Sequence, residues 1–174
     1  PGLENAVIFA VDNSPAMLKV FTKRTSPGRR TLRLRPLCID ICDVLVKNAS
    51  VAVINYTLQF IAPQAREPLL SGIYQGLVPG GILLLAEKTV HAHPEMARME
   101  QDFYHRFKKE NGYSELEISQ KRDALENVLI PDSKEAHLSR LRRIGFERCE
   151  LWFQWFNFSA FLARKGHDTG KRPA

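Results

Sequence analysis

Strand and helix signals alternate along most of this 174-residue chain, and the alternation predicts an α/β fold with a mostly parallel sheet. Two further observations support that class. The run ILLLA at 82–86 is apolar throughout, as expected of a strand buried on both faces. The runs VIFAVD at 7–12 and VAVINY at 51–56 each place a polar residue at or next to the strand end, where ligands bind in open α/β sheets.

The first predicted elements are a strand near 6–12 and a helix near 15–24. Pro15 suits the first turn of this helix, because the N–H that proline lacks has no partner there. Asp12 ends the strand, and a carboxylate in that position is well placed for the vicinal hydroxyls of a ribose. A basic turn, SPGRR at 26–30, leads to the next strand.

The parallel pattern continues with strands near 31–39 and at 51–56. A helix is predicted from about 63 to 76. Pro79-Gly80-Gly81 then makes a tight turn into a strand at 82–87.

A helical insertion at 94–130 interrupts this rhythm with two helices separated by Asn111-Gly112. One face of the first helix is apolar, which favours core or dimer packing over a ligand site. The residues of this face are Met96, Met99, Phe103 and Phe107. Ser114 and Glu117 form a capping box at the start of the second helix.

The second helix of the insertion carries a cation within an apolar stripe. Ile118, Leu125 and Leu129 share one face, and Arg122 projects from the middle of it. Burying that charge unpaired is costly. It needs an anion, either Glu126 one turn later or a bound ligand, and the residues alone slightly favour the ion pair.

The C-terminal part is predicted to form a helix to about Arg143, which Gly145 ends. FERCELWFQ and FNFSAFLAR follow as an antiparallel hairpin. We predict one domain at 1–165 and a disordered tail at 166–174.

Composition predicts a cytoplasmic protein, because no apolar run reaches 18 residues and the N-terminus is no signal peptide. Neither the Cys38/Cys42 pair nor the His91/His93 pair has further ligands in sequence, so no metal site is expected. The net charge of +6 is concentrated between Asp12 and Asp40. That stripe suits phosphates or an acidic partner, although its lack of interleaved aromatic residues favours a solvated surface.

Five segments resemble the carboxy-S-adenosyl-L-methionine synthase family, which has the Rossmann-like fold of class I S-adenosylmethionine (SAM) methyltransferases. They are VDNSPAML at 11–18, CIDI at 38–41, KNASVAVINYTLQF at 47–60, FKKENGYSELEISQKRDALENV at 107–128 and ELWFQWFNF at 150–158. The likeness covers nearly all of 6–164, and the last two segments carry its most specific motifs.

The resemblance implies an enzyme that looks like a methyltransferase and transfers no methyl group. Members take SAM as cofactor and prephenate as the source of a carboxyl group, release phenylpyruvate and make carboxy-SAM. A partner enzyme uses carboxy-SAM to modify the wobble uridine of certain tRNAs, so the link to tRNA is indirect. Members are homodimers, and we expect the dimer interface within 94–130.

The resemblance also implies the cofactor contacts. Asp12 accepts hydrogen bonds from the ribose hydroxyls, with Asn13 beside it. Asp40 takes the exocyclic amine of the adenine, and the backbone N–H of Ile41 meets a ring nitrogen. Asn55 approaches the sulfonium or methionine part. Taken singly, these three positions equally suit an N-cap, a turn carboxylate and a strand-end amide.

Arg122 lies at the matching position of the family's QKR motif. The resemblance implies that it is the catalytic cation facing the carboxylate which the cofactor gains, and this moves the balance from ion pair to ligand contact. An ordinary SAM-dependent methyltransferase has no need of that cation. A non-catalytic domain that dimerises or binds RNA is the third alternative.

The family's first strand and Gly-rich loop have no counterpart in these residues. In the family's sheet, that strand lies between the strands predicted at 6–12 and 51–56. We therefore expect a gap in the hydrogen-bond ladder and uncovered apolar helix faces. A C-terminal fragment, a rearranged sheet or a second chain would each account for this, and the absence of an initiator Met fits a fragment.

Overall fold

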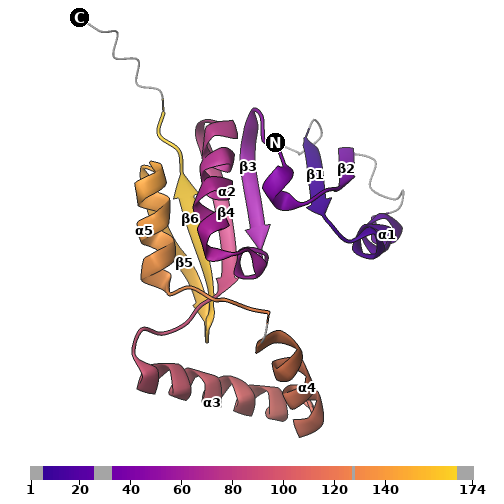
Figure 1. Cartoon of the computed structure of the whole chain (residues 1–174), viewed down its shortest axis with the longest axis vertical. Helices are drawn as coiled ribbons and strands as arrows, with labels where there is room; N and C mark the ends of the chain where they lie inside the picture. Colours follow the sequence, from indigo (N-terminus) through magenta and orange to yellow (C-terminus); the bar gives the residue numbers. More distant parts are fainter. Residues whose placement is uncertain (1–5, 26–32, 127, 168–174) are drawn as a thin grey trace, which may run out of the picture. The chain divides into compact units, whose positions relative to one another are not determined.

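The computed structural model describes residues 6–25, 33–126 and 128–167, with side chains except at 121–126. The chain divides into two compact units, Pro1–Leu45 and Val46–Ala174 (Figure 1). The predicted single domain at 1–165 stays a prediction. The basic turn at 26–30 and the tail at 168–174 lie outside the described residues.

The first unit is a strand–helix–strand motif. β1 (Val7–Asp12) pairs in parallel with β2 (Arg33–Cys38), and α1 (Pro15–Arg24) lies between them in sequence. Ser14 is the N-cap of α1, since its hydroxyl oxygen accepts the N–H of Met17 at 3.3 Å. These elements confirm the predicted strand, helix and strand.

The second unit is built on a four-stranded sheet in the order β3-β4-β6-β5. β3 and β4 are parallel, and β6 lies antiparallel to both of its neighbours, as the predicted terminal hairpin requires. The strand bounds are Ala49–Asn55 for β3, Leu77–Lys88 for β4, Arg148–Trp155 for β5 and Phe158–Arg164 for β6.

Two helices, α2 (Pro63–Gly76) and α5 (Lys134–Ile144), pack on one face of this sheet (Figure 1). Gly145 ends α5 with a φ of 114°, a left-handed conformation that glycine adopts without steric cost. Leu83, Leu85 and Phe161 form the centre of the core beneath the helices, each no more than 1% exposed.

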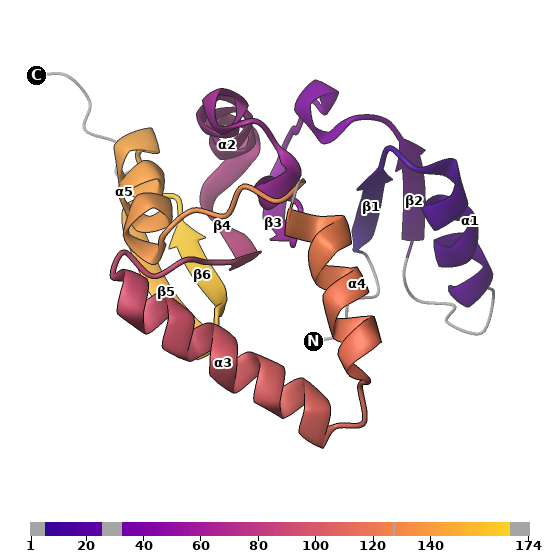
Figure 2. The ribbon, with the colours of Figure 1, turned by 60° about the horizontal axis from the view of Figure 1, so that its bottom comes forward.

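The insertion forms α3 (Pro94–Glu110) and α4 (Glu115–Glu126), as predicted. The capping box is present, because the N–H of Ser114 donates to Glu117 and the N–H of Glu117 donates back to the Ser114 hydroxyl. Figure 2 shows α3 along the end of the β5–β6 hairpin, where Phe107 packs edge-on against Trp155 at 4.7 Å between ring centroids.

The prediction that a turn at Pro79-Gly80-Gly81 precedes the strand is wrong, because β4 begins directly after α2, at Leu77. These residues form a bulge within the strand. Ala49 pairs with Leu77 and Val51 pairs with Ile82, so β3 advances by two residues where β4 advances by five. Gly80 has a φ of 75° within this bulge.

The predicted gap in the ladder is confirmed: in the described residues, β1-β2 and β3-β4-β6-β5 are separate sheets. β3 is therefore an edge strand, and its Val51 and Val53 side chains are 50% and 65% exposed. Parallel strands are normally covered on both faces, so these two valines are apolar strand surface that is left uncovered. The expectation of uncovered helix faces stays a prediction. No helix among the described residues is long and apolar enough to cross a membrane.

Candidate functional site

Four of the predicted cofactor contacts lie together in the first unit. Asp12 ends β1 and Asn13 follows it, and Asp40 and Ile41 follow β2. The two strands are parallel and in register, with Asp12 paired to Cys38 and the N–H of Ile39 donating to the Asp12 carbonyl at 3.3 Å. The topology thus brings both pairs to the carboxyl edge of this sheet, where ligands bind in open α/β folds.

The two carboxylates at this edge are each oriented by a local turn. Asp12 Oδ1 accepts the N–H of Ser14 at 2.8 Å, and Asp40 Oδ1 accepts the N–H of Cys42 at 2.8 Å. A carboxylate has about four lone-pair sites, so each can accept further hydrogen bonds from a ligand. Asp12 is not the N-cap of α1, whereas Asp40 does cap the short 3₁₀ helix η1 (Ile41–Asp43).

The backbone at Ile41 suits the expected adenine contact. Ile41 is the first residue of η1, and the first N–H groups of a helix have no partner within that helix. This N–H and the Asp40 carboxylate are adjacent in sequence, which provides one donor beside one acceptor. The geometry is compatible with the predicted contacts, which stay predictions.

In the second unit, Asn55 is the last residue of β3 and is exposed. The chain then turns at Tyr56, whose φ of 52° is in the left-handed region, and the N–H of Tyr56 donates to the Ala86 carbonyl at 2.7 Å. Arg122 lies within α4, but its side chain and that of Glu126 fall outside the described side chains. The choice between ion pair and ligand contact therefore stays open.

A buried carboxylate that was not identified from the sequence binds the turn after Asn55. Glu87 of β4 is fully buried, and it accepts N–H groups from Thr57, Leu58 and Gln59 at 2.7 to 3.2 Å. Burial raises the pKa of Glu87 above its ordinary value, although the three N–H groups and the charge of Arg66 act in the opposite direction. A lone acid at the end of the apolar run LLLAEK is the signal that would have found it.

A second missed group joins α2 to the segment after α4. Arg66 is 1% exposed and pairs with Asp132 at 2.8 Å, while Arg140 reaches the same Asp132 oxygen at 2.7 Å. Burial raises the pKa of Asp132, but hydrogen bonds from Arg140 and Arg66 outweigh it and hold the pKa below its usual range. No local pattern in sequence marks these pairs, because their partners come from different elements.

Tyr56 contacts a cluster of aromatic side chains through Phe158. Its ring meets Phe158 edge-on at 5.7 Å between centroids, and Tyr104 of α3 meets Phe158 at 5.3 Å. Within the ELWFQWFNF segment, Trp155 joins the same cluster. The predicted apolar face of α3 is only partly used, since Met96, Met99 and Phe103 remain 40 to 53% exposed.

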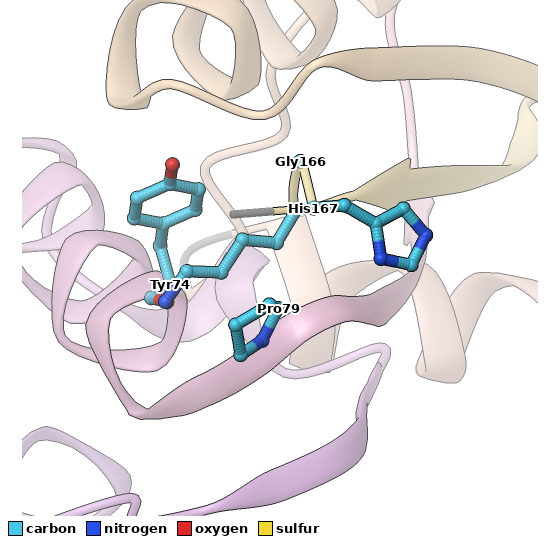
Figure 3. Close-up of a pocket in the computed structure, with 5 residues that line it drawn as sticks. Tyr74, Pro79, Gly166 and His167 are labelled. Carbon is cyan, nitrogen blue, oxygen red and sulfur yellow. The ribbon is translucent and has the colours of Figure 1, made fainter. Parts of the chain in front are cut away.

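A small pocket lies at the opposite end of the sheet from Asn55. Tyr74, Pro79, Gly166 and His167 line it (Figure 3), together with Lys165. The Lys165 ammonium donates to the carbonyls of Tyr74 and Leu77, at 2.9 and 2.7 Å, and so caps the end of α2. Because Pro79 is near the start of β4 and Asn55 pairs near its end, this pocket is separate from Asn55.

Among the described residues, no group of three or more His, Cys, Asp or Glu side chains is arranged to hold a metal ion. His91 and His93 lie between β4 and α3. The expectation that the protein has no metal site stays a prediction.

Comparison with known proteins gives close relatives. No family model matches the chain. Proteins named carboxy-S-adenosyl-L-methionine synthase are 48% identical in Photorhabdus laumondii and 46% identical in Shigella sonnei, over 165 and 166 residues. Each alignment covers 95% of this chain, and 66% and 67% of the relative. The chain therefore spans about two thirds of the length of these curated relatives.

Solved structures show the fold. A putative O-methyltransferase from Nostoc punctiforme matches with a TM-score of 0.64 and 16% identity, over 92% of this chain and 44% of its own. Human N-acetylserotonin methyltransferase in complex with SAM matches with a TM-score of 0.59 and 16% identity, over 92% and 40%. These neighbours confirm the predicted class I methyltransferase fold. With that fold, and with 46% identity to relatives that it largely covers, the chain belongs to the carboxy-S-adenosyl-L-methionine synthase family, a family of enzymes.

Proposed function

We propose that this protein makes carboxy-SAM from SAM and prephenate. The observation that carries the proposal is the 46 to 48% identity, over 95% of the chain, to relatives named carboxy-S-adenosyl-L-methionine synthase. The carboxyl edge of β1 and β2 supports it, because a carboxylate ends β1 and another follows β2, where a nucleoside is expected.

We assign the cofactor contacts as the resemblance implies. Asp12 and Asn13 bind the ribose, Asp40 and Ile41 bind the adenine, and Asn55 of the second unit meets the methionine part. Their places at strand ends support these roles.

In the proposed reaction, aromatisation drives the loss of carbon dioxide from prephenate. The leaving hydroxide and a proton from the cofactor's methyl group form water. The sulfonium ylide that remains attacks carbon dioxide, and the new C–C bond gives carboxy-SAM beside phenylpyruvate. Arg122 holds the carboxylate formed in this step, since a fixed cation stabilises charge most strongly in a dry site.

The chemistry of the product points to a second enzyme that uses it. A carboxymethyl sulfonium is a group donor, so we propose that a downstream tRNA-modifying enzyme transfers its group to the wobble uridine. The protein's own link to tRNA is then indirect. We place this chemistry in the cytoplasm, in a homodimer without membrane contact.

The test is a product assay on the whole protein as its host produces it. Incubation with SAM and prephenate should give equal amounts of phenylpyruvate and of a SAM derivative heavier by one carbon dioxide, measured by mass spectrometry. Omission of prephenate should abolish both products. A methylated acceptor formed in their place would establish an ordinary methyltransferase instead.

A further inference from the structure

Glu87 is the most deeply buried acid in the described part of the chain, and its carboxylate has three backbone partners. Oε1 accepts the N–H groups of Thr57 and Leu58 at 3.1 and 2.7 Å, and Oε2 accepts the N–H of Gln59 at 3.2 Å. These are consecutive N–H groups at the start of the 3₁₀ helix η2 (Leu58–Phe60). A buried carboxylate is tolerated only with such partners, so carboxylate and turn depend on each other.

The turn that Glu87 holds begins directly after Asn55. Tyr56 has a φ of 52°, which is unfavourable for a residue with a side chain and persists only where surrounding contacts enforce it. The N–H of Tyr56 is fixed to Ala86 at 2.7 Å, and the next three N–H groups are fixed to Glu87. The direction in which the chain leaves Asn55 is therefore set by the end of β4.

The same network extends to the segment after α4. Gln59 is 8% exposed, its side-chain oxygen accepts the N–H of Lys88 at 3.3 Å, and its carbonyl accepts the N–H of Ile130 at 3.0 Å. The Ile130 carbonyl in turn accepts Arg66 at 2.6 Å. Both polar backbone atoms of Ile130 are thus held, just beyond the helix that carries Arg122.

We propose that Glu87 is a positioning residue for the cofactor site. By holding the turn at Asn55–Gln59, Glu87 fixes the position of Asn55. Through Gln59 it also fixes the backbone at Ile130, in the segment after α4. The inference rests on the proposed function, because that function is what makes Asn55 a cofactor contact. Glu87 itself touches no cofactor and acts only through the turn.

The test compares Glu87→Gln and Glu87→Ala with Leu141→Ala in the whole protein. Leu141 is a matched control, because it is fully buried in α5 and makes none of these hydrogen bonds. All three variants should unfold at lower temperature. At a temperature where each is folded, SAM should bind about tenfold more weakly to Glu87→Gln and more weakly still to Glu87→Ala, while Leu141→Ala keeps the wild-type affinity.

Two readouts separate positioning from simple stability. Hydrogen exchange should quicken at the Thr57, Leu58, Gln59 and Ile130 amides in the Glu87 variants, and not in Leu141→Ala. The KM for SAM should rise about tenfold with kcat changed much less, because the reacting groups are unaltered once the cofactor is seated.

The outcomes are distinct. Wild-type affinity in Glu87→Gln, with wild-type protein binding SAM, would overturn the positioning role and leave the proposed function standing. Equal loss of affinity in Leu141→Ala would reduce Glu87 to a stabilising residue. Failure of the wild-type protein to bind SAM would remove the proposed function and this inference with it.

Discussion

At the scale of single residues, Arg122 separates carboxyl transfer from methyl transfer in the proposed reaction. Arg122→Ala removes the cation opposite the new carboxylate, so carboxy-SAM should bind roughly ten- to hundredfold more weakly while SAM loses little. Arg122→Lys should restore only part, because a point charge does not reproduce the planar guanidinium. Calorimetric titration of both ligands measures the difference.

Two results would contradict that role. Equal losses for the two ligands in Arg122→Ala would remove Arg122 from the reacting end of the site. If Glu126→Ala destabilises the fold and weakens both ligands together, Arg122 belongs to a structural ion pair instead.

His137 provides a pH test of the buried core. It is 2% exposed, and neither ring nitrogen has a hydrogen-bond partner in the described structure. Burial lowers the pKa of His137 from 6.5 to about 4, against the opposing charge of Asp132 and with a smaller contribution from Arg140 and Arg66. As the pH falls, His137 therefore binds a proton near pH 6.5 in the unfolded chain and only near pH 4 in the folded chain.

The stability contributed by the low pKa of His137 should accordingly be fully present above about pH 7 and be lost as the pH falls. Between pH 7.5 and 5 the His137 contribution is on the order of 2 kcal/mol. Asp132 stays ionised over this range, because its pKa is held low. Urea unfolding of His137→Leu should lose this part of the pH dependence, and an unchanged slope would show that other groups cause it.

At the scale of elements, an ion pair of Asp132 with Arg66 joins the segment between α4 and α5 to α2. Arg66 and Arg140 share the Asp132 carboxylate, and Arg66 is almost wholly buried. Asp132→Ala leaves a buried guanidinium without its counter-charge, so the free energy of unfolding should fall by about 3–5 kcal/mol. Chemical denaturation measures this loss.

The Glu67–Arg143 pair is the matched control for Asp132, because it joins α2 to α5 at the surface with 57% of Arg143 exposed. Glu67→Ala should change stability little, since solvent screens such pairs. A loss in Glu67→Ala equal to that in Asp132→Ala would show that burial is not what gives the Asp132 pair its effect.

At the scale of the whole molecule, the exposed apolar face of α3 points to self-association. Met96, Met99 and Phe103 are 40 to 53% exposed although they share one helix face. We predict a homodimer through this face, which Phe103→Glu should convert to a folded monomer by placing a charge in the interface. Sedimentation at micromolar concentration distinguishes the two states, and Phe103→Glu that stays dimeric would place the interface elsewhere.

The sequence by itself determined the local elements and the predicted half-sites. Gly145 ends α5, Ser114 starts α4, Asp12 ends β1 and Asp40 follows β2, because caps and strand periodicity act over a few residues. The sequence also predicted the gap in the hydrogen-bond ladder, since β1-β2 and β3-β4-β6-β5 are separate sheets among the described residues.

Only the tertiary structure decided which distant groups meet. It extended β4 back to Leu77, because Leu77 pairs with Ala49 although Gly80 and Gly81 follow within the strand. It placed Glu87 against the Asn55 turn and Arg66 against Asp132, and no local pattern encodes those pairs. The physical reason is burial: a charge taken out of water must be matched by partners from other elements, which are chosen by packing of the whole unit.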